Sequence, residues 1–193
     1  MLIYEEYLDY LMNKRYMSNY LMNKFNIHIN LEDEKIYIPS YDKDGNLNLY
    51  ISRGIDNKAD YFIKGNKNEI IFNHYLVDFN KPIILTEGFF DGYRLQNFIP
   101  LLGKDLSEES LLFKYLIFHK TPIILILDNE EKTINNKIKI AEQFKYYNSE
   151  HLIYIGELKD NYKDIGSIKD LNIDCFNFFE WSDELKFNMM AKI

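Results

Sequence analysis

The 193-residue sequence predicts an α/β fold: a central, mostly parallel sheet flanked by helices and preceded by a small α+β subdomain. The first observation behind this prediction is that short apolar runs at 82–86, 122–127 and 152–156 alternate with segments of helical periodicity. This alternation is typical of βαβ units, whose strands are buried on both faces. The second observation is that the pattern changes near residue 80, before which apolar and polar residues alternate as in a hairpin.

The N-terminal part, residues 1–78, is expected to be the α+β subdomain. The expected elements are helices over 4–13 and 17–25 and strands over 35–39, 47–52 and 60–63. Ser18 is a suitable cap for the second helix. The run Asp42-Lys43-Asp44-Gly45-Asn46 is a strong turn signal between the first two strands, which predicts a hairpin.

The second part, residues 79–175, is expected to hold the parallel sheet, and residues 176–193 a C-terminal helix. In order, we expect a strand over 82–86, helices over 89–98 and 107–118, a strand over 122–127, a helix over 132–146, a strand over 152–156 and a helix over 176–190. Apolar strands that alternate with helices pair in parallel, so their carboxyl ends meet at one edge of the sheet.

Composition narrows the class of protein. The net charge is −7, which argues against a protein that coats nucleic acid but not against an enzyme that holds it locally. The single cysteine, Cys175, excludes an internal disulfide and a zinc site built from several thiolates. No apolar run reaches the ~18 residues of a membrane span. The acidic residues among Met1–Lys14 are not those of a signal peptide, so we expect a cytoplasmic protein that does not enter a membrane.

Carboxylates follow the first apolar strand. Glu87 comes directly after the strand and precedes Gly88, a residue without a Cβ that lets a ligand approach. Asp91 lies four residues further on, in the first turn of the next helix, and can point back to the same edge. The alternative for Asp91 is an acid that stabilises the helix N-terminus through the helix dipole.

A second pair of carboxylates, Asp128 and Glu130, follows the next strand. Residues i and i+2 of an extended chain face the same side, and two carboxylates there repel unless a cation lies between them. The alternative is a turn with an aspartate cap. Since parallel strands end at one edge, we expect Glu87, Asp128 and Glu130 to surround a shared divalent cation.

Charged residues elsewhere are weaker candidates. Lys163 and Asp164 lie in the loop after the third strand, which opens at the same edge, although surface Lys-Asp pairs are common. Arg53 ends the second hairpin strand, and Lys58 and Lys64 follow it. These three cations are either a solvated basic loop or a surface that holds phosphates.

These motifs resemble the Toprim domain, which primases of the DnaG type share with topoisomerases and some nucleases. The resemblance rests on Glu87-Gly88-x-x-Asp91-Gly92, Asp128-x-Glu130 and Lys163-Asp164. The N-terminal part resembles the opening of a bacterial primase core. It matches in order through Tyr7-Leu8, Arg15-Tyr16-Met17-Ser18, Phe25-Asn26-Ile27, Pro39-Ser40-Tyr41-Asp42-x-x-Gly45 and Ser52-Arg53.

The resemblance implies roles for the matching residues. Glu87 would be the catalytic acid/base residue or a member of the metal shell. Asp128, Glu130, Asp91 and, more weakly, Asp164 would hold two or more Mg²⁺ or Mn²⁺ ions. Arg53, Lys58, Lys64 and Lys163 would bind nucleotide or template. The sequence departs from the family in the second motif, which is usually Asp-x-Asp. Here Glu130 takes the place of the second aspartate, and its side chain is one methylene longer.

The resemblance also implies a function. The chain would be a DNA primase core, a nucleotidyltransferase of the DNA-directed RNA polymerase class that joins ribonucleoside triphosphates on single-stranded DNA. No zinc-binding template reader is recognised, so a separate zinc-binding module and a replicative helicase are expected partners. Such minimal cores are typical of bacteriophages, which would place the protein in the host cytoplasm. A Toprim nuclease and a non-catalytic replication-binding protein are the alternatives.

Overall fold

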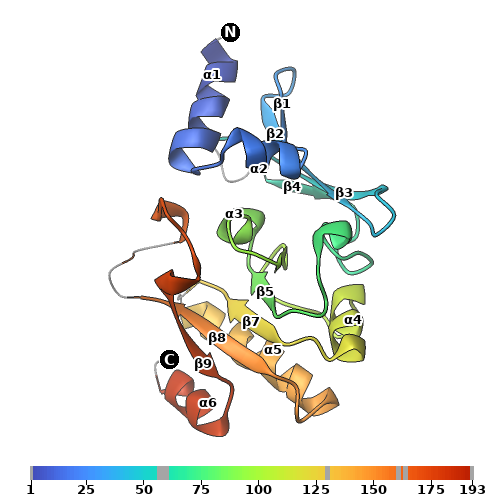
Figure 1. Ribbon diagram of the computed structural model, residues 1–193, viewed down its shortest axis with the longest axis vertical. Coiled ribbons are helices and arrows are strands. Elements are labelled where there is room, and N and C mark those ends of the chain that lie inside the picture. Colours follow the sequence, from blue (N-terminus) through green and yellow to red (C-terminus); the bar gives the residue numbers. More distant parts are fainter. Residues whose placement is uncertain (1, 56–60, 129–130, 160–161, 163–164, 192–193) are drawn as a thin grey trace. The chain divides into compact units, whose positions relative to one another are not determined.

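The structure is a computed structural model that describes residues 2–55, 61–128, 131–159, 162 and 165–191. The chain divides into two compact units, Met1–Tyr75 and Leu76–Ile193. In Figure 1 the first unit is drawn in blue to cyan, and the second runs from green to red. Among the described residues, no helix is both long enough and apolar enough to cross a membrane.

The N-terminal unit combines helices with an antiparallel sheet. Its elements are α1 (Leu2–Asp9), the π-helical segment η1 (Tyr10–Lys14), α2 (Asn19–Lys24), β1 (His28–Asn30), β2 (Lys35–Tyr41), β3 (Leu47–Arg53) and β4 (Phe62–Lys64). The strands pair in the order β1-β2-β3-β4, each antiparallel to its neighbour. The sheet therefore contains the predicted hairpin and, as β4, the strand expected over 60–63, and it adds β1, which was not expected.

Local chemistry fixes the turns of this unit as the sequence predicts. Ser18 caps α2 by accepting a hydrogen bond from the Leu21 amide at 3.3 Å. In the hairpin turn, one oxygen of Asp42 accepts hydrogen bonds from the amides of Asp44 and Asn46, both at 2.9 Å. Gly45 takes the left-handed conformation that the turn requires, with φ of 84°.

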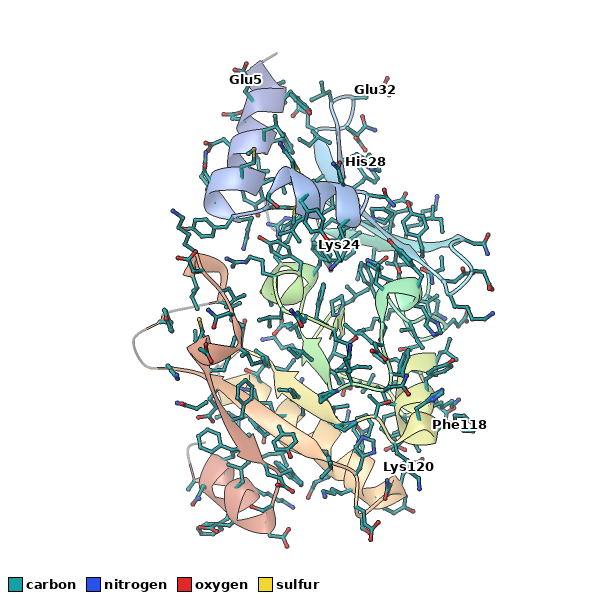
Figure 2. All side chains as sticks on the ribbon, viewed as in Figure 1. Glu5, Lys24, His28, Glu32, Phe118 and Lys120 are labelled. Carbon is teal, nitrogen blue, oxygen red and sulfur yellow. The ribbon has the colours of Figure 1, made fainter. Side chains whose placement is uncertain are left out.

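The two faces of this sheet differ in character. Ile36, Ile38 and Ile51 alternate onto one face and are fully buried. The opposite face carries aromatic side chains: His28 stacks on Tyr37 with ring centroids 5.3 Å apart, and His28 is labelled in Figure 2. This is the alternation of a sheet that buries one face in a core.

The C-terminal unit is built on a five-stranded sheet. Its elements are β5 (Ile83–Thr86), α3 (Phe89–Gly92), β6 (Phe98–Pro100), α4 (Leu111–His119), β7 (Ile123–Ile126), α5 (Glu131–Tyr147), β8 (Ile153–Leu158), β9 (Phe176–Glu180) and α6 (Asp183–Met190). The strand order is β6-β5-β7-β8-β9, and all neighbours are parallel except β8 and β9. The mostly parallel sheet with its helices confirms the predicted fold class.

Aliphatic side chains form the core of this unit. On one face of the sheet, Ile84 and Ile126 pack in a buried cluster with Leu95 and with residues that follow β8, among them Ile165 and Ile168. The intervening strand residues point to the other face and are equally buried. On α4 and α5, the rings of Phe113 and Phe144 lie 4.7 Å apart and link the two helices.

Several predicted elements are wrong in extent or type. β1 and β6 were not expected, because three-residue strands carry too little periodicity to be recognised. The helix expected over 89–98 ends as α3 at Gly92. The helix expected over 176–190 begins as a strand: Phe176–Glu180 pairs with β8, and only α6 is helical. A run rich in phenylalanine favours a strand, and the edge of the sheet offered a partner.

Candidate functional site

The predicted site lies where β5 and β7 end. These neighbouring parallel strands pair Thr86 with Ile126. Glu87 follows Thr86 directly, and Asp128 lies two residues beyond Ile126. Since paired strands are ~4.8 Å apart, the two acidic residues leave the sheet at the same edge. The structure therefore brings together the ends of the two strands, as the sequence predicts.

Glu87 is held by the backbone around it. Its carbonyl accepts a hydrogen bond from the Gly103 amide at 3.1 Å, and the Thr86 carbonyl accepts one from Leu101 at 2.8 Å. The chain after β6 therefore fixes the residue from one side. The Oε2 atom of Glu87 is buried, whereas Asp128 is exposed to solvent. A carboxylate oxygen that is removed from water needs a hydrogen-bond donor or a cation close by.

Asp91 has a structural task at the start of α3. Its Oδ2 atom accepts a hydrogen bond from the Gly88 amide at 2.8 Å. A Cβ built on Gly88 would lie 3.1 Å from that oxygen, so glycine permits the close approach. The helix-terminus role considered for Asp91 is thus present in the structure. A metal-binding role for the same carboxylate stays a prediction.

Several predicted site residues lie outside the described part of the chain. They are Glu130, Asp164, Lys58 and Lys163. Within the described ranges, no three His, Cys, Asp or Glu side chains are gathered closely enough to hold a metal ion. The donors that are described at the edge of the sheet, Glu87, Asp91 and Asp128, are all carboxylates, which are the ligands of hard cations such as Mg²⁺ and Mn²⁺.

Arg53 has an unexpected neighbour in the N-terminal unit. Its guanidinium lies 5.5 Å from the centre of the Tyr10 ring, and Arg15 lies 5.3 Å from the same ring. Arg15 also donates a hydrogen bond from Nε to the Tyr10 hydroxyl at 2.9 Å. Two guanidinium groups around one aromatic ring form a ready anion site. The prediction missed Arg15 and Tyr10, although Arg15 lies inside one of the recognised motifs.

Lys64 is not part of that arginine pair. It is paired with Tyr50 across the sheet, with its ammonium 5.8 Å from the centre of the Tyr50 ring. Tyr50 and Arg53 are three residues apart on β3, so their side chains leave opposite faces of the sheet. The structure therefore separates two of the cations that were predicted to act together.

A buried lysine on α5 also escaped prediction. Lys137 is only 1% exposed, and Thr133 one turn before it is fully buried. Helical side chains tilt toward the N-terminus of their helix, so the Lys137 stem leans toward the edge where β7 ends. The available signal was the spacing of Thr133, Lys137, Ile140 and Phe144 on one helical face.

Comparisons with known proteins place this geometry in a known fold. No protein-family model and no curated protein matches the sequence. Solved structures do match. The E. coli primase catalytic core superposes with a TM-score of 0.69 at 15% identity, covering 86% of this chain and 69% of that chain. The primase fragment of the bacteriophage T7 primase-helicase gives a TM-score of 0.60 at 18% identity, covering 79% of this chain and 65% of that chain.

A longer protein of known structure matches as well. The Aquifex aeolicus primase structure, which contains zinc-binding and RNA polymerase domains, gives a TM-score of 0.65 at 16% identity over 92% of this chain. The chain spans about half of that structure, 53% of its length. These matches extend over both compact units rather than over the parallel sheet alone. The chain therefore has the fold of a DnaG-type primase catalytic core.

Proposed function

We propose that this chain is a DNA primase catalytic core of the Toprim type, which joins ribonucleotides into short primers on single-stranded DNA. The observation that carries the proposal is the pair Glu87 and Asp128, which follow neighbouring parallel strands in a fold shared with primase cores. The resemblance of the motifs and the similarity of the fold both support nucleotidyl transfer.

Each part of the chain has a task in this proposal. Glu87 accepts the proton of the attacking 3′-hydroxyl, a role suited to a partly buried carboxylate fixed by its backbone. Asp128 and Asp91, with Glu130 and Asp164 from outside the described residues, would hold Mg²⁺ or Mn²⁺. When bound, such ions supply charge neutralisation for the triphosphate. Arg15 and Arg53 bind phosphates of the template or nucleotide at Tyr10.

Template and partners follow from the same proposal. One structural neighbour is a DnaG primase catalytic domain bound to single-stranded DNA, with a TM-score of 0.64 at 15% identity. Another is a structure with bacteriophage T7 primase domains bound to an RNA/DNA hybrid, which matches with a TM-score of 0.54 at 19% identity. We propose single-stranded DNA and ribonucleoside triphosphates as the ligands of this chain, and a helicase and a separate zinc-binding module as its partners.

The decisive experiment replaces Asp128. In Asp128→Asn the carboxylate loses its charge but keeps its shape, so the fold is retained. We expect primer synthesis to fall by a factor of roughly 100 or more, since the electrostatic stabilisation of the transition state is lost. The assay measures labelled ribonucleotide incorporation on single-stranded DNA with Mn²⁺. Glu109→Gln, which removes an exposed carboxylate paired with Lys114, is the control and should retain activity.

Three results would contradict the proposal. Full primer synthesis by Asp128→Asn would show that Asp128 is not part of the active site. Cleavage of the DNA without added nucleotides would indicate a nuclease. Absence of both activities, together with no Mn²⁺-induced rise in melting temperature of the wild-type protein, would indicate a non-catalytic protein, because a bound ion must stabilise the native state.

A further inference from the structure

Arg94 connects the segment after α3 to the segment after β8. Its Nη2 atom donates a hydrogen bond to the carbonyl of Ile165 at 3.1 Å. Its Nη1 atom donates to the carbonyls of Ile168 and Lys169, the latter at 3.2 Å. One guanidinium therefore holds three backbone carbonyls of a segment that lies more than 70 residues further along the chain.

The same segment is held from the apolar side. Ile165 and Ile168 are buried in the cluster that contains Leu95, the residue next to Arg94. The packing of Ile165 and Ile168 and the hydrogen bonds of the guanidinium thus act on the same short segment, residues 165–169. The guanidinium presents its donors in a rigid planar fork, which can satisfy separated carbonyls at the same time. A lysine ammonium has the same charge but lacks this geometry.

We infer that Arg94 is a positioning residue for the proposed active site. It lies three residues after Asp91, and Ile165 directly follows Asp164 in the sequence. By holding carbonyls of residues 165–169, Arg94 fixes them to the segment that directly follows α3, the helix that carries Asp91. The inference rests on the proposed function and adds a residue to it that touches no substrate.

The chain contains a matched clamp at the other end of β5. The Asn97 side-chain amide donates to the carbonyls of Asp78 and Pro82, both at 2.9 Å. These carbonyls precede β5, so this clamp lies at the amino end of the strand, away from the carboxylates. Asn97 has φ of 51°, a conformation that glycine adopts freely. Asn97→Gly therefore removes a comparable set of hydrogen bonds without straining the backbone.

The first measurement tests the clamp itself by hydrogen exchange in the full chain. In Arg94→Met we expect the amides of 165–169 to exchange about tenfold faster, as local opening becomes easier. Residues 78–82 should not change. Asn97→Gly should show the reverse pattern. Unchanged exchange at 165–169 in Arg94→Met overturns the inference, because the segment would then be held by its apolar side chains alone.

The second measurement tests positioning, at a temperature where circular dichroism shows every variant to be folded. We expect Arg94→Met to raise by about tenfold the Mn²⁺ concentration that gives half-maximal primer synthesis. The Mn²⁺ concentration that gives half of the maximal shift in melting temperature should rise by the same factor. The kcat of Arg94→Met should fall by about tenfold, since small misplacements of catalytic groups are costly. Arg94→Lys should behave like Arg94→Met, and Asn97→Gly should stay within about twofold of wild type.

The outcomes separate this inference from the proposed function. Faster exchange at 165–169 with unchanged Mn²⁺ dependence makes Arg94 a purely structural clamp and overturns its positioning role. Full recovery of the Mn²⁺ dependence by Arg94→Lys, while exchange stays fast, assigns the effect to charge and also overturns it. If the wild-type protein neither binds Mn²⁺ nor makes primers, the proposed function fails, and faster exchange then marks Arg94 as structural only.

Discussion

Tyr10 is the residue around which the N-terminal unit gathers positive charge. Arg15 and Arg53 come from different elements, the end of η1 and the end of β3, yet both lie within 5.5 Å of its ring centre. Each guanidinium is attracted to the aromatic ring, and this attraction offsets part of the repulsion between the two cations. An anion that binds between them would relieve that repulsion, which suits the site to phosphate.

A double-mutant cycle tests this arrangement. We expect Arg15→Ala and Arg53→Ala each to weaken binding of single-stranded DNA or triphosphate by roughly 1–2 kcal/mol, since both bonds to phosphate are charge-assisted. If the two arginines bind one phosphate, the double variant should lose less than the sum of the single losses. Binding is measured by fluorescence anisotropy. Strictly additive losses would assign the arginines to separate phosphates. Lys64→Ala removes a cation on the opposite face of the sheet and serves as the comparison variant.

His151 gives the second prediction at this scale. It is 2% exposed and packs on Phe144, with ring centroids 4.8 Å apart. Burial lowers the pKa of His151, and the charge of Lys145 acts in the same direction, whereas the nearby Thr121 backbone opposes it. Below the unfolded pKa of ~6.5 the unfolded chain takes up a proton that the folded chain resists. Stability should therefore fall as the pH drops below about 6.5, by at most ~1.4 kcal/mol per pH unit.

The measurement is urea unfolding at pH 7.5 and pH 5.5. His151→Phe keeps an aromatic ring against Phe144 but cannot be protonated, so its loss of stability between these two pH values should be smaller than that of wild type. His28→Gln, at an exposed position, serves as the control and should retain the wild-type difference. Equal losses in wild type and His151→Phe would show that other groups cause the acid sensitivity.

At the level of elements, the packing of α3 on the sheet depends on Gly92. A Cβ at this position would lie 2.2 Å from the Phe98 ring and 2.8 Å from the Thr86 hydroxyl oxygen. α3 ends at Gly92, and the chain then continues to β6 with Phe98 at its start. The glycine therefore lets the helix that carries Asp91 approach β5 and β6 closely.

Gly92→Ala should consequently lower the free energy of unfolding by roughly 1–3 kcal/mol, as expected for overpacking in a core. Urea denaturation measures the change. Combining Gly92→Ala with Phe98→Leu removes the overlapping ring, so the double variant should be more stable than the sum of the two single effects predicts. A fully stable Gly92→Ala variant would mean that Phe98 moves aside without cost.

The elements also show what the sequence could reveal. β5, β7 and β8 were predictable because uninterrupted apolar runs at the right spacing have few alternatives to a buried parallel sheet. From that sheet, the placement of Glu87 and Asp128 after the ends of neighbouring strands follows by topology. By contrast, β9 and the contacts of Arg94 depend on partners distant in the sequence. No local pattern tells that Phe176–Glu180 finds an edge at β8, or that Arg94 finds the carbonyls after Asp164.

At the scale of the whole molecule, charge opposes the proposed ligand. The chain carries 30 acidic and 23 basic residues, a net charge of −7. A polyanionic template is therefore repelled overall and must be held by local cations, of which the structure places Arg15 and Arg53 together. Divalent cations at the carboxylates would reduce the repulsion further. We therefore expect the isolated chain to bind template weakly, which fits the proposed need for a partner module.

This balance predicts a shallow salt dependence of template binding. Each phosphate neutralised on a single strand contributes about −0.7 to the slope of log K against log salt concentration. With Arg15 and Arg53 as the main contacts, we expect a slope of about −0.7 if they share one phosphate and about −1.4 if they bind two, in KCl, measured by anisotropy of a labelled oligonucleotide with Mn²⁺ held constant. Arg53→Ala should reduce the slope by about 0.7 if the two arginines bind separate phosphates, and by less if they share one. A wild-type slope steeper than about −4 would require six or more contacts, and hence a basic surface that two arginines do not provide.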